Sequence, residues 1–440
     1  GNLVFTQSGG SISQHAKSTM SFTFGEKKVC EMQTVSGSSI TLGICDEDFI
    51  ANANGFSGDS RGYFDTNGNK VDKDGNSSSY GASFGTSNVI RIEVDLSSNP
   101  GTIEFFKDGV SQGDAFTDIT STKTWFFWCR CKADAVKANF GQLGFAGTPT
   151  SGFTALNASN IPDPTISDPS VYFQTTLYTG NGSTQSISQS GENSTFQPDW
   201  VWIKNRDASD SHVLTDAVRG ATKIISSDAA TAESTDADTL TAFESDGFAL
   251  GDDVKVNTSS ENYVAWQWLA NGSGSSNSDG SITSTVTANT TAGFSIVKYT
   301  GTGSNATVGH GLGAVPKMIL IKDTTNTESW IVYHEGVGND GNLYLNLTNA
   351  KATQAIFQNT TPTSSVFSLG TTDGANKASG VHVAYCFAEI PGHSSIGSYT
   401  GNGSTDGTFV HTGFKPAWVL LKRTNATQEW QIYDLSLIHI

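Results

Sequence analysis

The densest group of oxygen-bearing side chains in this sequence lies between Asp65 and Asn76, which includes three aspartates and three asparagines. Carboxylate and amide oxygens are the ligands that Ca²⁺ prefers. A calcium loop of the EF-hand type, however, needs glycine at its sixth position and glutamate at its twelfth, where this stretch has Lys70 and Asn76. Asparagine, aspartate and glycine also dominate tight turns. We therefore interpret the stretch as a hairpin loop and predict no metal site.

Histidine and cysteine, which carry much nucleophilic and metal chemistry, are scattered along the chain. The eight histidines form no recurrent grouping with serine, aspartate or glutamate. His310 and His411 occupy similar positions ahead of an apolar strand, and we interpret them as structural hydrogen-bonding residues. Of the five cysteines, Cys129 and Cys131 form C-x-C, which is not the C-x-x-C of zinc or redox sites, so we expect free buried thiols. The sequence thus predicts no catalytic residues and no cofactor, and hence no enzyme.

A repeat organises the second half of the chain. The signature Tyr-Thr-Gly-x-Gly-Ser begins at Tyr178, Tyr299 and Tyr399, and each copy is followed by a proline that opens an apolar strand ending in lysine. An aromatic residue or histidine stands eight positions beyond each lysine, and an aspartate or histidine twelve beyond. Duplicated modules are usually structural or binding arrays, because catalysis needs one asymmetric group of residues. The three strands and the residues that follow them are Pro198 to Lys204 with His212 and Asp216, Pro316 to Lys322 with Trp330 and His334, and Pro416 to Lys422 with Trp430 and Asp434.

Two tryptophan pairs lie on strands of the first repeat, Trp200 with Trp202 and Trp266 with Trp268. Residues two apart on a strand project from one face, so each pair could form an aromatic platform that stacks on sugar rings. The alternative is a buried core, where large aromatic side chains remove the most area from water. We favour the core, because the counterparts in the second repeat are merely apolar, namely Met318, Leu320, Tyr385 and Phe387.

Length and composition limit the classes of protein that fit. A chain of 440 residues is long enough for about three domains. Only 15% of the residues are charged, so Ser, Thr, Asn and Gly cover much of the surface, as is typical of extracellular or virion β-proteins. The net charge of −17 opposes binding to phosphate backbones and excludes nucleic acid as a partner. No run of about twenty apolar residues exists, so we predict no membrane insertion.

The strand pattern predicts an all-β fold. From Ile90 to Leu96 apolar and charged residues alternate, which predicts a half-buried strand with Ile90, Ile92, Val94 and Leu96 on one face. A second strand, 102–107, follows the turn residues 99–101, and Asp108-Gly109 supplies a further tight turn. Helical periodicity is weak throughout.

Two stretches mark domain boundaries. Four of the ten prolines fall between 149 and 169, which predicts that residues 147–170 form a stiff connector instead of a strand. Residues 271–290 begin with a Gly/Ser-rich run and are expected to form a flexible linker. The predicted domains are residues 1–146, 171–270, 291–390 and a truncated module at 391–434. Residues 435–440 match the product of a common sequencing adaptor, so we expect an artefact there and take the chain as a fragment.

The first domain resembles the SPRY domain over residues 21–144. The likeness rests on the segments 36–44, 62–70, 80–81, 95–96 with 101–109, and 139–142. The resemblance implies a lectin-like β-sandwich that binds peptides or proteins through loops at one end and performs no catalysis. On this basis the candidate ligand contacts are Asp46, Tyr63, Asp65, Asn67 and Tyr80.

Residues 155–434 resemble modules of large marine bacteriophage proteins, most clearly at 309–317 and 383–389. The resemblance implies tandem β-sandwich modules in a tail or other virion-associated component. We therefore hypothesise a non-enzymatic host-contact protein that is exposed on the virion, binds a host-surface protein or glycan and other virion proteins, and could form homo-oligomers. The alternatives are the non-catalytic binding region of a polysaccharide-degrading enzyme and a purely structural fibre component.

Overall fold

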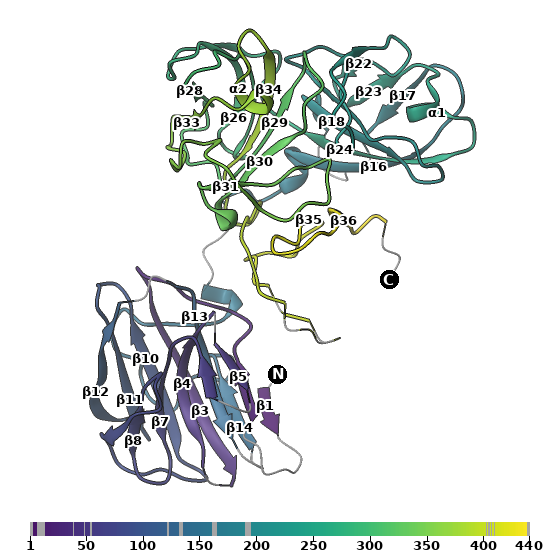
Figure 1. Ribbon diagram of the computed structural model, residues 1–440. Helices are drawn as coiled ribbons and strands as arrows, with labels where there is room; N and C mark the ends of the chain where they lie inside the picture. Colours follow the sequence, from purple (N-terminus) through teal and green to yellow (C-terminus); the bar gives the residue numbers. More distant parts are fainter. Residues whose placement is uncertain are drawn as a thin grey trace. The chain divides into compact units, whose positions relative to one another are not determined.

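The structure, a computed structural model, describes residues 3–6, 14–37, 39–47, 49–52, 55–120, 123–131, 135–160, 165–189, 195–401, 403, 405, 407–408 and 410–437. Two compact units divide the chain, residues 1–162 with 399–411 and residues 163–398 with 412–440. Strands dominate both units (Figure 1). The prediction of an all-β fold is confirmed.

The first unit is a sandwich of two antiparallel sheets, with one short parallel strand added at β3. One sheet has the order β1-β14-β3-β10-β11-β12, and the other β2-β13-β4-β7-β8-β9. The first sheet contains β1 (Leu3–Thr6), β14 (Ala135–Asn139), β3 (Lys27–Ser36), β10 (Val89–Asp95), β11 (Gly101–Lys107) and β12 (Val110–Ile119), with β15 (Thr154–Ala155) beside β3. The second contains β2 (Gln14–Lys17), β13 (Trp125–Cys131), β4 (Thr41–Asp46), β7 (Ser60–Phe64), β8 (Asn69–Val71) and β9 (Ser77–Ser79), and β5 (Ile50–Asn52) pairs with β6 (Gly55–Ser57).

The predicted strand at Ile90 lies in the middle of the first sheet. Its four apolar side chains are fully buried in the core between the sheets, as the alternation predicted. The opposite face is buried as well, since Arg91 and Glu93 are only 4% and 2% exposed and form an ion pair of 2.9 Å. The prediction of a half-buried strand is therefore wrong for this outer face. The amide of Thr150 donates to Glu93 Oε1 (2.9 Å), so the segment that follows β14 covers this outer face of the first sheet.

Residues 147–170 were predicted to form a stiff connector, and for the first half of this stretch the prediction is wrong. Thr154–Ala155 forms β15, a short parallel strand beside β3, and Leu156 is buried in the core of the sandwich. The physical reason is that the prolines of the 147–170 stretch lie before and after this part, so its backbone donors remain available for pairing.

Each of the first two repeats is a sandwich of a large and a small sheet. In the first repeat the large sheet is β16-β24-β18-β19 and the small one β17-β23-β22, around a shared apolar core. These strands are β16 (Phe173–Thr179), β17 (Gln185–Ser188), β18 (Trp200–Asn205), β19 (Val213–Asp216), β22 (Leu240–Glu244), β23 (Gly247–Leu250) and β24 (Asn262–Trp268), with the two-stranded β20 (Lys223–Ile224) and β21 (Ser234–Thr235) alongside.

The second repeat follows the same plan with more strands. Its large sheet has the order β25-β26-β27-β34-β29-β30, and β28 pairs with β33. The strands are β25 (Ser275–Asn277), β26 (Ser284–Asn289), β27 (Phe294–Thr300), β28 (Ala306–Gly309), β29 (Met318–Asp323), β30 (Ile331–His334), β33 (Val366–Leu369) and β34 (Val381–Phe387), with β31 (Gly341–Asn342) paired to β32 (Ala352–Thr353).

The prediction of a flexible linker at 271–290 is therefore wrong, because β25 and β26 extend the large sheet of the second repeat. Serine and threonine do not prevent strand pairing when a neighbouring strand satisfies the backbone. Every second residue from Ser284 is small or apolar, and Ser284 and Val286 are buried. This period of two was present in the sequence but was masked by the polar composition.

Short elements complete the second unit. The third repeat contributes the hairpin β35 (Trp418–Leu421) and β36 (Gln431–Asp434). Its helical turns are α1 (Val254–Asn257), α2 (Asp373–Asn376), η2 (Pro169–Val171) and η3 (Glu335–Val337), whereas η1 (Ala158–Asn160) belongs to the first unit. None of the described helices has the length and apolar character needed to span a bilayer.

The tryptophan pairs lie between the repeats. Trp200, Trp202 and Trp266 are 1–2% exposed and Trp268 is 8% exposed, so the core interpretation is confirmed. They belong to one apolar cluster with side chains of the second repeat, and the rings of Trp200 and Tyr385 stack with centroids 4.3 Å apart. The large sheets of the two repeats thus pack face to face instead of forming separate bodies.

Candidate binding surface

A hollow of about 280 Å³ opens at one edge of the first sandwich. Strands β8 and β9 end one sheet and β12 ends the other, so the hollow lies between two matching sheet edges. Its lining combines acidic, basic, amide, hydroxyl and apolar side chains, namely Lys70, Asp72, Asn76, Ser78, Asp114, Ala115, Phe116, Thr117 and Asp118.

The charges around the hollow are predominantly negative. Lys70 donates from Nζ to the carbonyl oxygen of Ala115 and lies 5.3 Å from the centroid of the Phe116 ring. Asp114 and Asp118 are exposed on β12. The buried guanidinium of Arg61 approaches Asp118 to 3.5 Å and so links the two sheets behind the hollow. The surface can accept hydrogen bonds and attract a cationic or hydroxyl-bearing group.

Asp72 belongs to the loop that resembled a calcium site. Its Oδ1 accepts hydrogen bonds from the amides of Asp74 (3.0 Å) and Asn76 (2.9 Å), which closes the turn between β8 and β9. Although partial burial acts to raise it, these hydrogen bonds hold the pKa of Asp72 below its usual value. The interpretation as a hairpin loop is confirmed. In the described part of the chain, no three His, Cys, Asp or Glu side chains are grouped closely enough to hold a metal ion.

Four of the five candidate contacts lie close to this edge but differ in access to solvent. Tyr63 is fully buried, donates to the carbonyl of Ala82 and packs edge-on against Tyr80, with ring centroids 5.3 Å apart. Asp65 is also buried, at 2% exposure. Asn67 is exposed and Tyr80 half-buried. Tyr63 and Asp65 thus belong to the buried packing behind this edge. Direct contact with a ligand stays a prediction for Asn67 and Tyr80.

Asp46, the fifth candidate, lies at the end of β4. Its side chain is 1% exposed and its Oδ2 lies 3.2 Å from Nζ of Lys123. Because the carboxylate is covered, it cannot reach a ligand in this conformation, and we assign it to the packing of the sandwich. The residues that sequence reasoning missed, Asp114, Phe116 and Asp118, lie on a strand about forty positions beyond the predicted loops, so nothing in the sequence placed them there.

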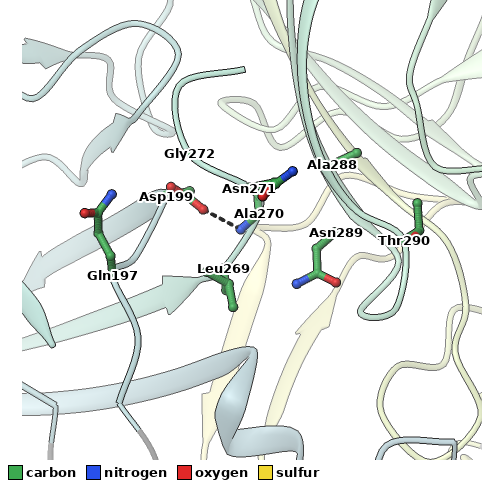
Figure 2. Close-up of a pocket in the computed structure, with 9 residues that line it drawn as sticks. All are labelled: Gln197, Asp199, Leu269, Ala270, Asn271, Gly272, Ala288, Asn289 and Thr290. Carbon is green, nitrogen blue, oxygen red and sulfur yellow. Dashed lines mark hydrogen bonds between the residues drawn. The ribbon is translucent and has the colours of Figure 1, made fainter. Parts of the chain in front are cut away.

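A second hollow, of about 450 Å³, lies where the first repeat passes into the second (Figure 2). Asp199 is 1% exposed there and accepts from the amide of Ala270 at 2.8 Å, and burial raises the pKa of Asp199. Gln197, Asn271 and Asn289 line the remainder with small residues. The carboxylate fastens the start of β18 to the chain beyond β24, which is a structural role.

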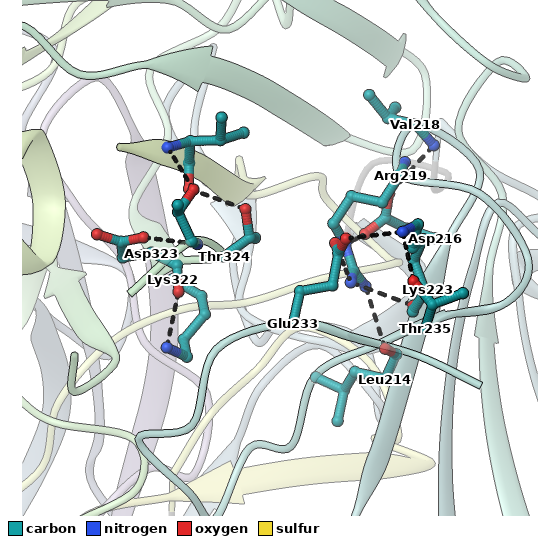
Figure 3. Close-up of polar contacts among 12 residues, drawn as sticks. Leu214, Asp216, Val218, Arg219, Lys223, Glu233, Thr235, Lys322, Asp323 and Thr324 are labelled. Atoms are coloured by element: carbon teal, nitrogen blue, oxygen red, sulfur yellow. Dashed lines mark hydrogen bonds and ion pairs between the residues drawn. The ribbon is translucent and has the colours of Figure 1, made fainter. Parts of the chain in front are cut away.

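A buried group of charged side chains lies between the repeats (Figure 3). Asp216 binds the guanidinium of Arg219, which also contacts Glu233 at 3.2 Å and the carbonyl of Leu214 at 3.0 Å. Tyr385 of the second repeat donates its hydroxyl to Asp216 Oδ2 at 2.7 Å. Each charge is paired, as a buried charge must be, and the group therefore holds two repeats together instead of offering a reactive side chain.

The histidine and cysteine interpretations are confirmed where the structure bears on them. His310 is buried, its Nε2 lies 3.1 Å from the carbonyl of Thr363, and its Nδ1 accepts from the amide of Leu312 at 3.2 Å. Burial lowers the pKa of His310, which favours the neutral ring. Cys30, Cys45, Cys129 and Cys386 are buried free thiols, and Cys131 is buried as well.

The repeat signature has a structural cause that the sequence did not reveal. In the second repeat Tyr299 donates to the carbonyl of Ala375 (2.7 Å), while Asn376 Oδ1 accepts from the amide of Thr302 (2.8 Å). Asn376 Nδ2 donates to the carbonyls of Ser304 and Gly370, both at 2.7 Å. Asn257 makes the equivalent contacts in the first repeat, with Asn181, Ser183 and Gly251. One buried asparagine thus secures the signature loop in each of the first two repeats.

These features define an all-β protein in which a two-sheet sandwich is followed by packed repeats. The SPRY family matches residues 29–143, which confirms a SPRY domain. The family described as "domain of unknown function (DUF7483)" matches residues 168–437, more than half of the sequence. The chain belongs to the DUF7483 family.

Two solved structures are similar to the SPRY part. The SPRY domain of human HERC1 is 16% identical with a TM-score of 0.27, and the match covers 31% of this chain and 87% of that one. A further human SPRY domain is 13% identical with a TM-score of 0.26, covering 31% of this chain and 90% of that one. No curated protein matches the chain.

Proposed function

We propose that this protein is a non-enzymatic binding protein whose SPRY domain holds a protein or glycan ligand at the hollow between β8, β9 and β12. The observation that carries the proposal is the coincidence of a SPRY domain with a hollow that joins the edges of both sheets. The lining is acidic, with the Phe116 ring beneath it. A basic peptide side chain or a cluster of sugar hydroxyls would find both hydrogen-bond acceptors and apolar contact there.

We also propose that the protein is exposed on a bacteriophage virion, at the tail or another host-contact position. The likeness of residues 155–434 to phage modules and the Ser/Thr/Asn/Gly-rich surface support this location. On a symmetric particle many copies act together, so a weak contact at each SPRY hollow is multiplied by avidity. The repeats would then serve as a stiff support for the SPRY domain and as a contact surface for other virion proteins.

Peptide and glycan arrays probed with the whole 440-residue chain test the binding proposal. We expect hits enriched in basic peptides or in one class of glycan. The double variant Asp114→Lys with Asp118→Lys should weaken these hits at least about tenfold, since it reverses the charge at the hollow. Asp74→Lys is the control, because Asp74 is exposed in the turn between β8 and β9 but does not line the hollow. Equal binding by all three proteins would contradict the proposal.

Immunogold labelling of purified virions tests the location separately. Antibody against the SPRY domain should decorate one defined part of the particle. Absence of label on intact virions, with label on the purified protein, would rule out an exposed virion position while leaving the binding proposal to the arrays.

A further inference from the structure

The contacts between the first and second repeats recur between the second repeat and the third hairpin. Nζ of Lys322 donates to the carbonyl of Ala230 (3.1 Å), and Nζ of Lys422 donates to that of Thr348 (2.8 Å). In both cases the acceptor lies 26 positions beyond the equivalent lysine of the preceding repeat, 230−204 and 348−322. The same chemistry therefore joins repeat two to repeat one and repeat three to repeat two.

Tryptophan follows the same rule. Nε1 of Trp330 donates to the carbonyl of Ser226 and Nε1 of Trp430 to that of Tyr344, both at 2.8 Å. Each acceptor lies 22 positions beyond the lysine of the preceding repeat, 226−204 and 344−322. The lysine contact and the tryptophan contact thus define a head-to-tail interface that is used twice.

A backbone hydrogen bond completes this interface. The amide of Glu233 donates to the carbonyl of Thr324 (2.9 Å), and that of Lys351 donates to the carbonyl of Thr424 (2.8 Å). The donors stand 29 positions beyond the lysines of their own repeats, 233−204 and 351−322. The acceptors stand two beyond the lysines of the following repeats, 324−322 and 424−422. Figure 3 shows Lys322 and Thr324 of the second repeat in the same view as the Asp216 group.

A further contact joins the third hairpin to the first repeat. Tyr385 of repeat two donates to Asp216 of repeat one, and Trp266 of repeat one donates from Nε1 to Asp434 of repeat three (2.8 Å). Tyr385 and Trp266 are equivalent residues of β34 and β24, and the two aspartates are equivalent residues of β19 and β36. Repeat two thus contacts repeat one, repeat three contacts repeat two, and repeat one contacts repeat three. The three repeats therefore form a closed ring.

Within the described part of this ring, some residues do not make the contact that their equivalents make in another repeat. His334 is the second repeat's equivalent of Asp216 and Asp434. On the paired strands, His334 lies opposite Met318, just as Asp216 lies opposite Trp200 and Asp434 lies opposite Trp418. In the described chain, β35 pairs with β36 along one edge, while the edge that β24 and β34 occupy in the other repeats has no strand beside it. The side chains of β35 are half-buried, whereas their equivalents Val201 and Ile203 are fully covered.

Lys204 and His212 form the opposite side of this opening. Nζ of Lys204 donates within its own repeat, to the carbonyls of Asn205 and Ala208. Nδ1 of His212 accepts from Nε1 of Trp202 (2.7 Å), which leaves Nε2 as the N–H donor. A ring N–H is also what Trp330 and Trp430 present at this position, so His212 is chemically matched to a carbonyl of a third repeat.

We propose that the free edge of β35, His334, Lys204 and His212 together form a docking surface for a polypeptide segment with the sequence of the late half of this repeat. Its β-strand adds to β35 as β24 adds to β18, and its carbonyls accept from Lys204 and His212. The strand carries tyrosine at the position of Tyr385. Nδ1 of His334 accepts a hydrogen bond from the amide of Gly336 (3.0 Å), so Nε2 of His334 carries the ring proton and acts as a donor. The hydroxyl of a tyrosine can accept a hydrogen bond from Nε2, whereas the indole of tryptophan can only donate one.

A labelled peptide with the sequence of residues 379–389, carrying Cys386→Ser to prevent oxidation, tests the docking on the whole chain. Fluorescence anisotropy should show saturable binding, and hydrogen exchange should show protection of residues 418–421. Binding should weaken about three- to tenfold for peptides with Tyr385→Phe or Tyr385→Trp, and equally for the protein variant His334→Phe. A peptide that binds without protecting 418–421, or one that is indifferent to Tyr385, would overturn the proposal.

A fusion guards against an insoluble or unstructured peptide. Residues 335–390 are joined after Asp434 in place of the last six residues, with a scrambled sequence of the same composition as the control. The expected result is protection of 418–421 and a higher Tm in the fusion alone. If residues 418–421 exchange equally in both fusions, the docking surface does not exist. Protection of β35 by dimerisation of the unmodified chain, detected by sedimentation, would assign the edge to a second copy instead and likewise overturn the proposal.

Discussion

At the scale of single residues, buried asparagine and glycine set the shape of the repeats. Asn376 makes three hydrogen bonds with backbone groups of the signature loop and its surroundings, at 2.7–2.8 Å. The sequence signature pointed to the loop itself, but Asn376 lies more than seventy positions away and could not be linked to it from spacing alone. Only the fold brings the two together.

Replacement of Asn376 by alanine should therefore be costly. It leaves the amide of Thr302 and the carbonyl of Gly370 without their partner, at about 1–3 kcal/mol for each unsatisfied group, while the carbonyl of Ser304 keeps the hydroxyl of Thr302. We expect the free energy of unfolding to fall by about 3 kcal/mol in urea denaturation. Asn339→Ala is the control, because Asn339 bonds to Thr361 at an exposed site. Similar losses in the two variants would show that the loop does not depend on this asparagine.

His212 predicts a dependence of stability on pH. Burial, together with nearby Lys204, outweighs the attraction of Asp228 and lowers the pKa of His212 to about 4. Between pH 6.5 and 4 the unfolded chain thus binds a proton that the folded protein excludes, so folding stability falls as the pH falls through this window. His212→Asn, which keeps an acceptor for Trp202, should flatten the slope of unfolding free energy against pH. An unchanged slope would mean that this ring is protonated without cost.

At the scale of elements, periodicity was a better guide than composition. The alternation at Ile90 predicted the buried face of β10 correctly. Composition misled at β15 and at β25–β26, where prolines or Gly/Ser runs indicated connectors but neighbouring strands offered partners for the backbone. The candidate hollow was only partly predictable: the β7–β9 hairpins carried a recognisable pattern, whereas β12 reaches the same edge through sheet topology alone.

The turn after β27 gives a prediction at this scale. A Cβ at Gly301 would lie 2.3 Å from the carbonyl oxygen of Lys377, so the signature loop and the segment after α2 approach too closely for a side chain. Gly301→Ala should lower the free energy of unfolding by about 1–3 kcal/mol through overpacking. Gly397→Ala is the control, since a Cβ there meets no atom within 4 Å. Thermal unfolding of both variants would separate steric conflict from a general effect of losing glycine.

At the scale of the whole molecule, the second unit has cores of two kinds. Each repeat has its own apolar core, and a further cluster is shared between the large sheets of both repeats and the β35–β36 hairpin. The sequence indicated three modules of similar length but not that their tryptophan faces would pack on one another. Offsets along one repeat identify equivalent residues, whereas the partner of each residue depends on how the sheets are stacked.

The shared core predicts that the first two repeats unfold together. Trp200 is 1% exposed and contacts Trp268 of its own repeat and Tyr385 of the next, with ring centroids 4.3 Å away in both cases. Trp200→Ala should cost about 3–5 kcal/mol, and hydrogen exchange should show equal loss of protection in β18 and β34 because the cavity weakens both sheets. Val254→Ala, at a site that is 60% exposed, serves as control. If protection fell in the first repeat alone, each repeat would be an independent folding unit, and the packed sheets would contribute little to stability.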